Sequence, residues 1–230
     1  MISENVLRIK NRIEAICSKL NRDTKQVCIV AVSKGRTVLQ IEEVINAGIT
    51  DIGENKVQEA LLKYNELEAK GFKTTLRWHM VGHLQTNKVK DAVRIFDLIH
   101  SVDSVRLAAE INKEARKINK VQDILVEVNI SRDPAKYGLK PEDTQDTVRQ
   151  ISDFKNIRIK GLMGIAPQVD DQQKTRSCFR QLKELFENIN KLPVTNHQLQ
   201  FLSMGMTDDF EVAVEEGSNM IRLGRKIFEG

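Results

Sequence analysis

Short apolar runs alternate with stretches of helical periodicity from one end of the chain to the other. Runs of strand length lie at residues 27–33, 49–53, 77–82, 98–102, 123–131, 157–165, 199–205 and 219–224. Helical periodicity is found at residues 38–48, 57–71, 104–119, 143–153, 171–191 and 208–217. An amphipathic helix precedes them all, because Val6, Ile9, Ile13 and Ile16 recur at helical spacing.

Strands that alternate with helices predict a parallel sheet covered by helices. Eight strand and helix units in 230 residues fit a single (β/α)8 barrel of the TIM type, with one extra helix at the N-terminus. An open doubly wound sheet is the rival, but the first strand is not followed by G-x-G-x-x-G. No linker or shift in composition divides the chain, so we expect one domain over residues 1–230.

Composition and charge narrow the function without defining it. Apolar residues make up 40% of the chain and charged residues 30%, as in ordinary globular proteins. The net charge of +4 is spread along the chain, so no nucleic acid partner is expected. Residues 1–20 carry charges throughout and predict neither a signal peptide nor a membrane span. Cys17, Cys28 and Cys178 are an odd number without a C-x-x-C pair, which predicts reduced thiols and a cytoplasmic protein.

In a barrel the chemistry lies where the strands end and the following loops begin. The residues found at those positions are Lys34, Glu54, Asn55, Gly82, His83, Ser101, Asp103, Asn129, Met163, Ser203, Met204, Gly205, Arg222 and Gly224. The glycine-bearing loops follow the seventh and eighth strands, where barrels commonly bind a phosphate on backbone N–H groups. Thr207 and Asp208 are expected to cap the next helix and to complete this anion site.

Lys34 follows the apolar run "VCIVAVS" directly, which leaves three interpretations open. It is a solvated loop lysine, the Schiff-base lysine of a class I aldolase, or the lysine of a pyridoxal 5′-phosphate site. Burial at the barrel mouth would lower the pKa of its amine and favour the nucleophilic form.

The histidine pair near residue 80 and the aspartate at residue 103 have simpler structural explanations than a functional site. His79 and His83 form H-x-x-x-H, but the pair spans a predicted strand end and lacks an adjacent glutamate, so no metal site is predicted. We expect Trp78 and His79 to pack or to form hydrogen bonds at the barrel mouth. Asp103 is expected to be a cap or first-turn carboxylate of the helix that follows it.

Seven motifs resemble the pyridoxal phosphate homeostasis proteins, also called proline synthase co-transcribed homologues. They are "AVSKGRT", "DIGENKVQEALLK", "WHMVGHLQTNK", "HSVDS", "VNISRDPAKYG", "GLMGIAP" and "LSMGMTDDFEVAVEEGSNMIRLGRKIF". The resemblance runs from about residue 28 to 228. It implies a barrel like the N-terminal domain of alanine racemase, which binds pyridoxal phosphate without a demonstrated turnover and maintains vitamin B6 balance.

The resemblance also implies roles for residues of the cofactor site. Lys34 matches the lysine that forms the internal aldimine, and Asn55 matches the amide beside the cofactor ring. The phosphate loop corresponds to Ser203, Met204 and Gly205, and is completed by Gly224 and the backbone N–H of Arg225. Arg222 corresponds to the arginine that faces the pyridine nitrogen. A guanidinium cannot accept a hydrogen bond, so this nitrogen would stay unprotonated and the ring would be a weaker electron sink.

The sequence departs from the family pattern at three places. "SKGRT" differs from the usual "SKTKP" at Gly35, and Lys56 stands where many members have tyrosine. The chain ends in "IFEG" and lacks the usual "IFG" followed by arginine. None of these positions is assigned to the aldimine or the phosphate.

The alternative function is a fold-type III amino-acid racemase or a related decarboxylase. Such an enzyme needs a second acid or base opposite the lysine, which is supplied by the partner's C-terminal β-domain. Tyr64 and Tyr137 are predicted on a helix and in a loop, so neither is an evident candidate. The chain is therefore expected to be a non-catalytic cofactor carrier. We expect it to be a monomer that lacks the β-domain and delivers the cofactor to PLP-dependent apoenzymes.

Overall fold

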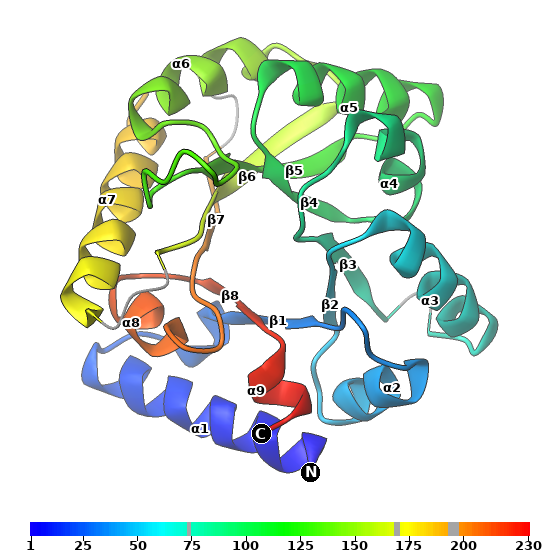
Figure 1. Ribbon diagram of the computed structural model, residues 1–230, viewed down its shortest axis with the longest axis vertical. Helices are drawn as coiled ribbons and strands as arrows, with labels where there is room; N and C mark the ends of the chain where they lie inside the picture. The colour runs from blue at the N-terminus through cyan, green and yellow to red at the C-terminus, as the bar shows by residue number, and fades with distance from the viewer. Residues whose placement is uncertain (73–74, 168–170, 193–197) are drawn as a thin grey trace.

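The strands close into a parallel barrel surrounded by helices (Figure 1). The computed structural model describes residues 1–72, 75–167, 171–192 and 198–230. Within these residues each strand pairs with the next one along the chain, and β8 pairs with β1 to complete the ring. The predicted (β/α)8 class is therefore confirmed.

The strands match the predicted apolar runs closely. They are β1 Cys28–Val32, β2 Asp51–Glu54, β3 Arg77–Met80, β4 Leu98–Val102, β5 Gln122–Val128, β6 Ile157–Gly164, β7 Phe201–Ser203 and β8 Met220–Leu223. Only β2 and β5 extend beyond their predicted ranges, each by one residue. Two-sided burial explains the agreement, since strands covered on both faces are nearly continuous apolar runs.

The helices include two that the periodicity does not predict. They are α1 Ile2–Lys19, α2 Val38–Asn46, α3 Val57–Ala69, α4 Val89–Ile95, α5 Val105–Lys117, α6 Pro141–Ser152, α7 Gln172–Asn190, α8 Phe210–Glu215 and α9 Arg225–Phe228. The unpredicted helices α4 and α9 span seven and four residues, too short for a 3.6-residue period to be visible. No helix among the described residues is long and apolar enough to span a membrane.

Helix α1 lies in the outer ring beside α8 and α9, with the two chain ends close together (Figure 1). Its apolar face, which includes Ile9 and Ile13, is buried. Asn5 donates a hydrogen bond from Nδ2 to the backbone oxygen of Ile227 at 3.0 Å and so links α1 to α9. The predicted extra N-terminal helix is therefore present, and it packs beside the short terminal helix α9.

The barrel interior contains both apolar and polar side chains. Val30, Leu98, Leu125, Met163 and Met220 form an apolar cluster separate from the larger core. Several buried polar residues also lie on the strands, and five of them are connected by hydrogen bonds. These five are Asp51 on β2, His79 on β3, His100 on β4, Ser203 on β7 and Arg222 on β8. Burying polar groups is unfavourable unless they form hydrogen bonds, so these residues need hydrogen-bond partners within the barrel.

Candidate functional site

A cavity of about 430 Å³ lies at the end of the barrel where the strands finish. Of the predicted cofactor residues, Lys34, Asn55, Arg222, Gly224 and Arg225 line it. Val32, Val81 and Ile165 form apolar walls, and the loop after β7 adds Met206, Thr207 and Asp208. The volume is within the range of small-molecule sites, and the lining combines apolar walls with a few polar groups.

Lys34 stands at the rim of this cavity and is exposed. Its amine is therefore not buried, so the activation that burial at the barrel mouth would give it does not apply here. Strand β1 ends at Val32, so the chain has already left the barrel wall when it reaches Lys34. Gly35 follows with φ +68°, in the left-handed region that favours glycine, which explains why this residue suits the sharp turn after the lysine.

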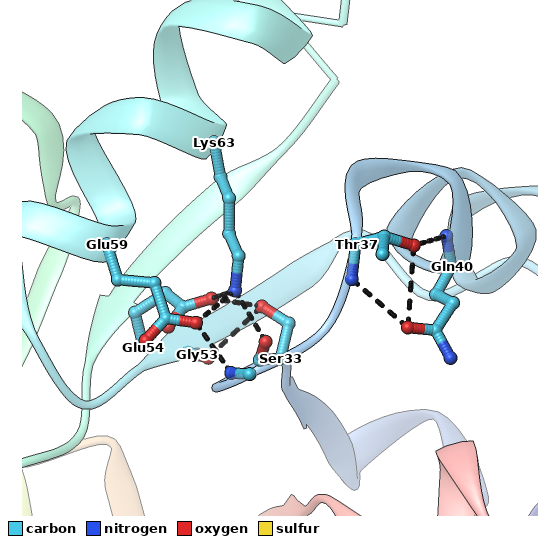
Figure 2. A network of polar contacts seen from close by, with 8 residues as sticks. Ser33, Thr37, Gln40, Gly53, Glu54, Glu59 and Lys63 are labelled. Atoms are coloured by element: carbon cyan, nitrogen blue, oxygen red, sulfur yellow. Dashed lines mark hydrogen bonds and ion pairs between the residues drawn. The ribbon is translucent and has the colours of Figure 1, made fainter.

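Lys63, which is buried, is the centre of a network of polar contacts that includes Ser33, Glu54 and Glu59 (Figure 2). Lys63 on α3 donates from Nζ to the backbone oxygen of Ser33 at 2.6 Å, and to Oε1 of Glu54 and Oε1 of Glu59, each at 2.7 Å. The Ser33 hydroxyl donates to Glu54 Oε1 at 2.5 Å, and the Gly35 N–H donates to Glu59 Oε1 at 2.5 Å. These contacts, which we call the lysine clamp, fix the residues that flank Lys34.

The two carboxylates of the lysine clamp differ in their electrostatics. Burial raises the pKa of Glu54, although Lys63 and Ser33 oppose it with hydrogen bonds. Burial also acts to raise the pKa of Glu59, but hydrogen bonds from Lys63 and the Gly35 N–H outweigh it, so this pKa is lowered. Because an ammonium has three N–H donors and Lys63 has three acceptors, no donor of Lys63 is left over.

The α2 helix begins immediately after the Lys34 loop and is well capped (Figure 2). Thr37 accepts a hydrogen bond from the Gln40 backbone N–H, and the Gln40 side chain accepts one from the Thr37 N–H. This reciprocal capping box satisfies two backbone donors at the helix start. The loop is thus fixed by the lysine clamp on one side and by a rigid helix on the other.

Arg222 projects from β8 into the barrel and is only 4% exposed. It donates from Nη1 to Ser203 Oγ at 2.5 Å and from Nη2 to the backbone oxygen of Gly164 at 3.0 Å. Burial lowers the pKa of Arg222 to about 10, while the charges of Asp209 and Glu127 oppose this change. The guanidinium is therefore still protonated at neutral pH and acts only as a hydrogen-bond donor.

Ser203, Met204 and Gly205 do not line the cavity. The Ser203 side chain is fully buried against Arg222 and His100, and Met204 is part of the larger core. Gly205 has φ +95°, and a Cβ atom there would lie 2.5 Å from the Ala213 Cβ. These three residues shape the turn that brings the next residues to the cavity.

The helix after β7 begins differently from the sequence expectation. Thr207 and Asp208 were expected to cap it, but its N-cap residue is Asp209, whose Oδ1 accepts from the Met206 N–H at 2.6 Å. Asp208 instead accepts a hydrogen bond from Nη2 of Arg225 at 2.7 Å. The capping prediction is wrong because the chain makes one more turn before the helix starts.

Arg225 and Gly224 form the other wall of the anion end of the cavity. Gly224 is the N-cap of α9 and Arg225 its first residue. The first N–H groups of a helix have no partner within it, which suits the binding of an anion. The positive charges of Arg222 and Arg225 add to these N–H groups, so this end of the cavity favours an anionic group.

Glu127 is a buried carboxyl group near the site that the sequence reasoning missed. Burial, and secondarily the charge of Asp103, raises its pKa from 4.5 to about 7, and the charge of Arg222 opposes the rise. Nothing in the strand pattern of residues 123–131 distinguishes Glu127 from an outward-facing residue. Its raised pKa depends on burial and on the charges of Asp103, after β4, and Arg222, on β8, which only the closed barrel brings near it.

Replacing Glu127 with glutamine should change how stability depends on pH. Between pH 4.5 and 7 the folded protein keeps a proton that the unfolded chain has released, so stability falls as pH rises through this window. Above pH 7, Glu127→Gln should therefore be more stable than the wild type by roughly 2 to 3 kcal/mol, with little difference at pH 4.5. Urea unfolding at both pH values tests this, with the exposed Glu14→Gln variant as a control. An equal difference at both pH values would contradict it.

The two histidines of H-x-x-x-H lie in different environments. His79 is buried inside the barrel, whereas His83 is exposed, stacks on Tyr137 with ring centroids 3.7 Å apart, and has its Nδ1 3.6 Å from Asp103 Oδ2. Among the described residues, no three His, Cys, Asp or Glu side chains come together as a metal site. Trp78 is buried and packs against Tyr64, with the two ring centroids 5.7 Å apart.

Asp103 does not cap α5, contrary to the sequence expectation. The N-cap is Ser104, whose hydroxyl accepts a hydrogen bond from the Leu107 N–H at 3.2 Å. Asp103 lies one residue earlier and faces His83 instead. Lys56, one of the departures from the family pattern, is exposed and is the N-cap of α3.

Comparisons with known proteins place this arrangement among related sequences. The chain matches the family described as alanine racemase, N-terminal domain, over residues 5–229. It is 39% identical over 225 residues to the pyridoxal phosphate homeostasis protein of Aquifex aeolicus, which covers 98% of this chain and 96% of that protein. The protein of the same name from Haemophilus influenzae is 36% identical over 228 residues, with 99% and 94% covered.

Solved structures agree with the sequence comparisons. PipY of Synechococcus elongatus PCC7942, in a structure with PLP bound, aligns with a TM-score of 0.82 at 34% identity and covers 94% of this chain and 99% of that chain. Alanine racemase of Clostridium difficile 630 aligns with a TM-score of 0.76 at 14% identity, covering 97% of this chain and 56% of that chain. The second likeness concerns the fold alone.

Proposed function

Because the chain belongs to the family of pyridoxal phosphate homeostasis proteins, we propose that it binds pyridoxal 5′-phosphate covalently through Lys34 and does not turn over a substrate. In this function the protein holds the cofactor and contributes to vitamin B6 balance. The observation that supports the proposal most directly is the convergence of Lys34, Asn55, Arg222, Gly224 and Arg225 on one cavity.

The chemistry of the cavity residues fits the three functional parts of the cofactor. Lys34 supplies a primary amine at the rim for the aldehyde, and Arg222 supplies a fixed donor for the ring nitrogen. Gly224 and Arg225 supply N–H groups and positive charge for the phosphate. Asn55 borders the same cavity and supplies an amide for the ring edge. When bound, the cofactor supplies an electrophilic aldehyde and a ring able to accept electrons.

Ser203, Met204 and Gly205 enter this proposal as supporting residues. Ser203 accepts the Arg222 hydrogen bond, and Gly205 allows the turn that places Met206 and Thr207 at the cavity. Their backbone is the segment that the family resemblance assigns to the phosphate. Their side chains therefore support the turn, and only their backbone is a candidate for contact with the phosphate.

The absence of turnover is the second part of the proposal. Racemisation needs acid or base groups on both faces of the reacting carbon. Among the described residues that line the cavity, the ionisable ones are Lys34, Asp208, Arg222 and Arg225, and Asp208 is paired with Arg225. Arg222 is a donor only, so it does not favour the protonated ring that stabilises a carbanion. These features favour a carrier over a racemase.

Three further expectations belong to the same proposal. We expect the chain to act as one domain and as a monomer. Its three cysteines are free thiols, which fits a cytoplasmic location. PLP-dependent apoenzymes are the proposed recipients of the cofactor, and light scattering of the purified protein would test the monomer.

An absorbance titration followed by a turnover assay tests the proposed function. Adding pyridoxal 5′-phosphate to the purified protein should produce the band of a Schiff base near the edge of the visible range. L-alanine should then change the spectrum without producing D-alanine. Steady formation of D-alanine would instead establish the alternative, a fold-type III racemase. No band with added cofactor would overturn the binding proposal.

A further inference from the structure

A line of hydrogen bonds runs through the barrel interior from Arg222 to Asp51. Arg222 Nη1 lies 2.5 Å from Ser203 Oγ, which lies 3.2 Å from His100 Nδ1. His100 Nε2 lies 2.9 Å from His79 Nδ1, and His79 Nε2 lies 2.9 Å from Asp51 Oδ1. All five residues are at most 6% exposed. They come from five different strands, so the line exists only in the closed barrel.

The chemistry of the two ends sets the direction of every proton in this line. Asp51 holds its charge: burial acts to raise its pKa, but hydrogen bonds from His79 and Arg77 outweigh it, and the pKa is lowered. A carboxylate only accepts, so His79 donates from Nε2 and accepts at Nδ1. His100 then donates from Nε2 and accepts at Nδ1 from the Ser203 hydroxyl. Ser203 in turn accepts from Arg222, which only donates.

Protons donated in the opposite direction, from His79 through His100 toward Ser203, are less favourable for two reasons. It requires a second proton on His79, and it leaves the Ser203 hydroxyl proton without an acceptor among the described residues. Burial lowers the pKa of His100 well below its usual value, and the charge of Arg222 acts in the same direction, so this ring is neutral at pH 7.

We propose that Asp51, His79 and His100 are positioning residues that orient Arg222 through Ser203. The carboxylate at the far end fixes both imidazole tautomers, and the tautomers make Ser203 Oγ an acceptor for the guanidinium. Ser203 and the Gly164 oxygen each take one N–H group of Arg222. The remaining N–H groups of the guanidinium are then available toward the cavity that Arg222 lines.

This arrangement gives Asp51 an influence on a cavity that it does not line. Asp51 stands at the start of β2 and also accepts a hydrogen bond from Arg77 Nη2 at 2.8 Å. A change at Asp51 would therefore alter how Arg222 is presented to a ligand without touching that ligand. The influence on cofactor binding rests on the proposed function, whereas the tautomers do not depend on any ligand.

The first test measures the histidine tautomers in the protein without added cofactor. Nitrogen-15 spectra of the histidine-labelled full chain at pH 7 should show His79 and His100 each protonated at Nε2 and unprotonated at Nδ1. A doubly protonated ring at either position, or an Nδ1 proton on His100, would overturn the proposal. This result stands or falls separately from pyridoxal phosphate binding.

The second test replaces Asp51 with asparagine, which keeps its size and removes the charge that fixes the tautomers. An amide can rotate and donate to His79 Nε2, so the Asp51→Asn variant should show His79 and His100 with Nδ1 protons. If the proposed function holds, the affinity for pyridoxal 5′-phosphate should also fall on the order of tenfold, the effect of one lost oriented hydrogen bond to a charged group.

A matched control separates this effect from the loss of an Asp–Arg pair. Asp123 on β5 accepts two hydrogen bonds from Arg158, at 2.6 and 3.0 Å, and contacts neither histidine by hydrogen bond. The Asp123→Asn variant should leave both tautomers and the cofactor affinity unchanged. Unchanged tautomers in Asp51→Asn, or equal affinity losses in the two variants, would overturn the positioning role. If Asp51→Asn fails to fold, the wild-type spectra still decide the question.

Discussion

The Lys34→Ala variant is expected to lose the Schiff-base absorption band completely while keeping the fold. The band depends on a covalent bond to the side-chain amine, so removing Nζ removes the signal and does not merely weaken it. Lys34 is exposed and lies outside the barrel wall, and the contacts of the lysine clamp are made by its neighbours Ser33 and Gly35. Absorbance with added pyridoxal 5′-phosphate and circular dichroism measure the two effects.

Lys56→Ala is the matched control for this experiment. Lys56 is also exposed, and it lies next to Asn55 without lining the cavity. Its replacement should leave the band unchanged. A band of full intensity in Lys34→Ala would contradict the assignment of this lysine.

The Lys63→Met variant is expected to show the largest loss of stability, about 3 to 5 kcal/mol. Methionine keeps the apolar stem of lysine but leaves Glu54, which is fully buried, without its opposing charge. It also removes the hydrogen bond to the Ser33 oxygen, so the loop at Lys34 should become less ordered. The midpoint and slope of urea unfolding measure the change.

A double variant and an exposed control test the reason for this loss. Glu54→Gln combined with Lys63→Met removes both charges of the buried pair and should be more stable than Lys63→Met alone. Lys113 pairs with Glu110 on the exposed face of α5, so Lys113→Met should cause no measurable change. An equal loss in the single and double variants would show that the buried charge of Glu54 is not the cause.

The regular part of this fold follows from local patterns. The strands were predicted from short runs rich in apolar residues, and the long helices were predicted because one face is apolar over several turns. Helix α9 was missed because Arg225–Phe228 forms a single turn, which is stabilised by packing and not by a periodic sequence.

The candidate site was predictable only in part. Lys34, Asn55, Arg222 and Gly224 lie at strand ends, so chain order in a barrel is enough to bring them together. The roles of Asp103 and Asp208 were misjudged because a carboxylate near a helix start can also interact with a histidine or an arginine that the fold brings close to it. Here each pairs in that way, with His83 and Arg225 respectively.

The lysine clamp and the interior hydrogen-bond line had weaker signals in the sequence. Glu59 and Lys63 are spaced four residues apart, which indicates an ordinary helix pair, and only the fold places Glu54 and Ser33 beside them. His79 and His100 are 21 residues apart in sequence and meet because β3 and β4 are neighbours. Such contacts depend on barrel geometry, which short-range patterns do not contain.

Borohydride reduction of the protein with bound pyridoxal 5′-phosphate, followed by peptide mass spectrometry, tests the central claim most directly. Reduction makes the Schiff-base link permanent, so the labelled lysine identifies the residue that holds the cofactor. We predict a single reduced pyridoxyl label on Lys34. A label on Lys56 or Lys63 in place of Lys34, or no label at all, would contradict the proposed site.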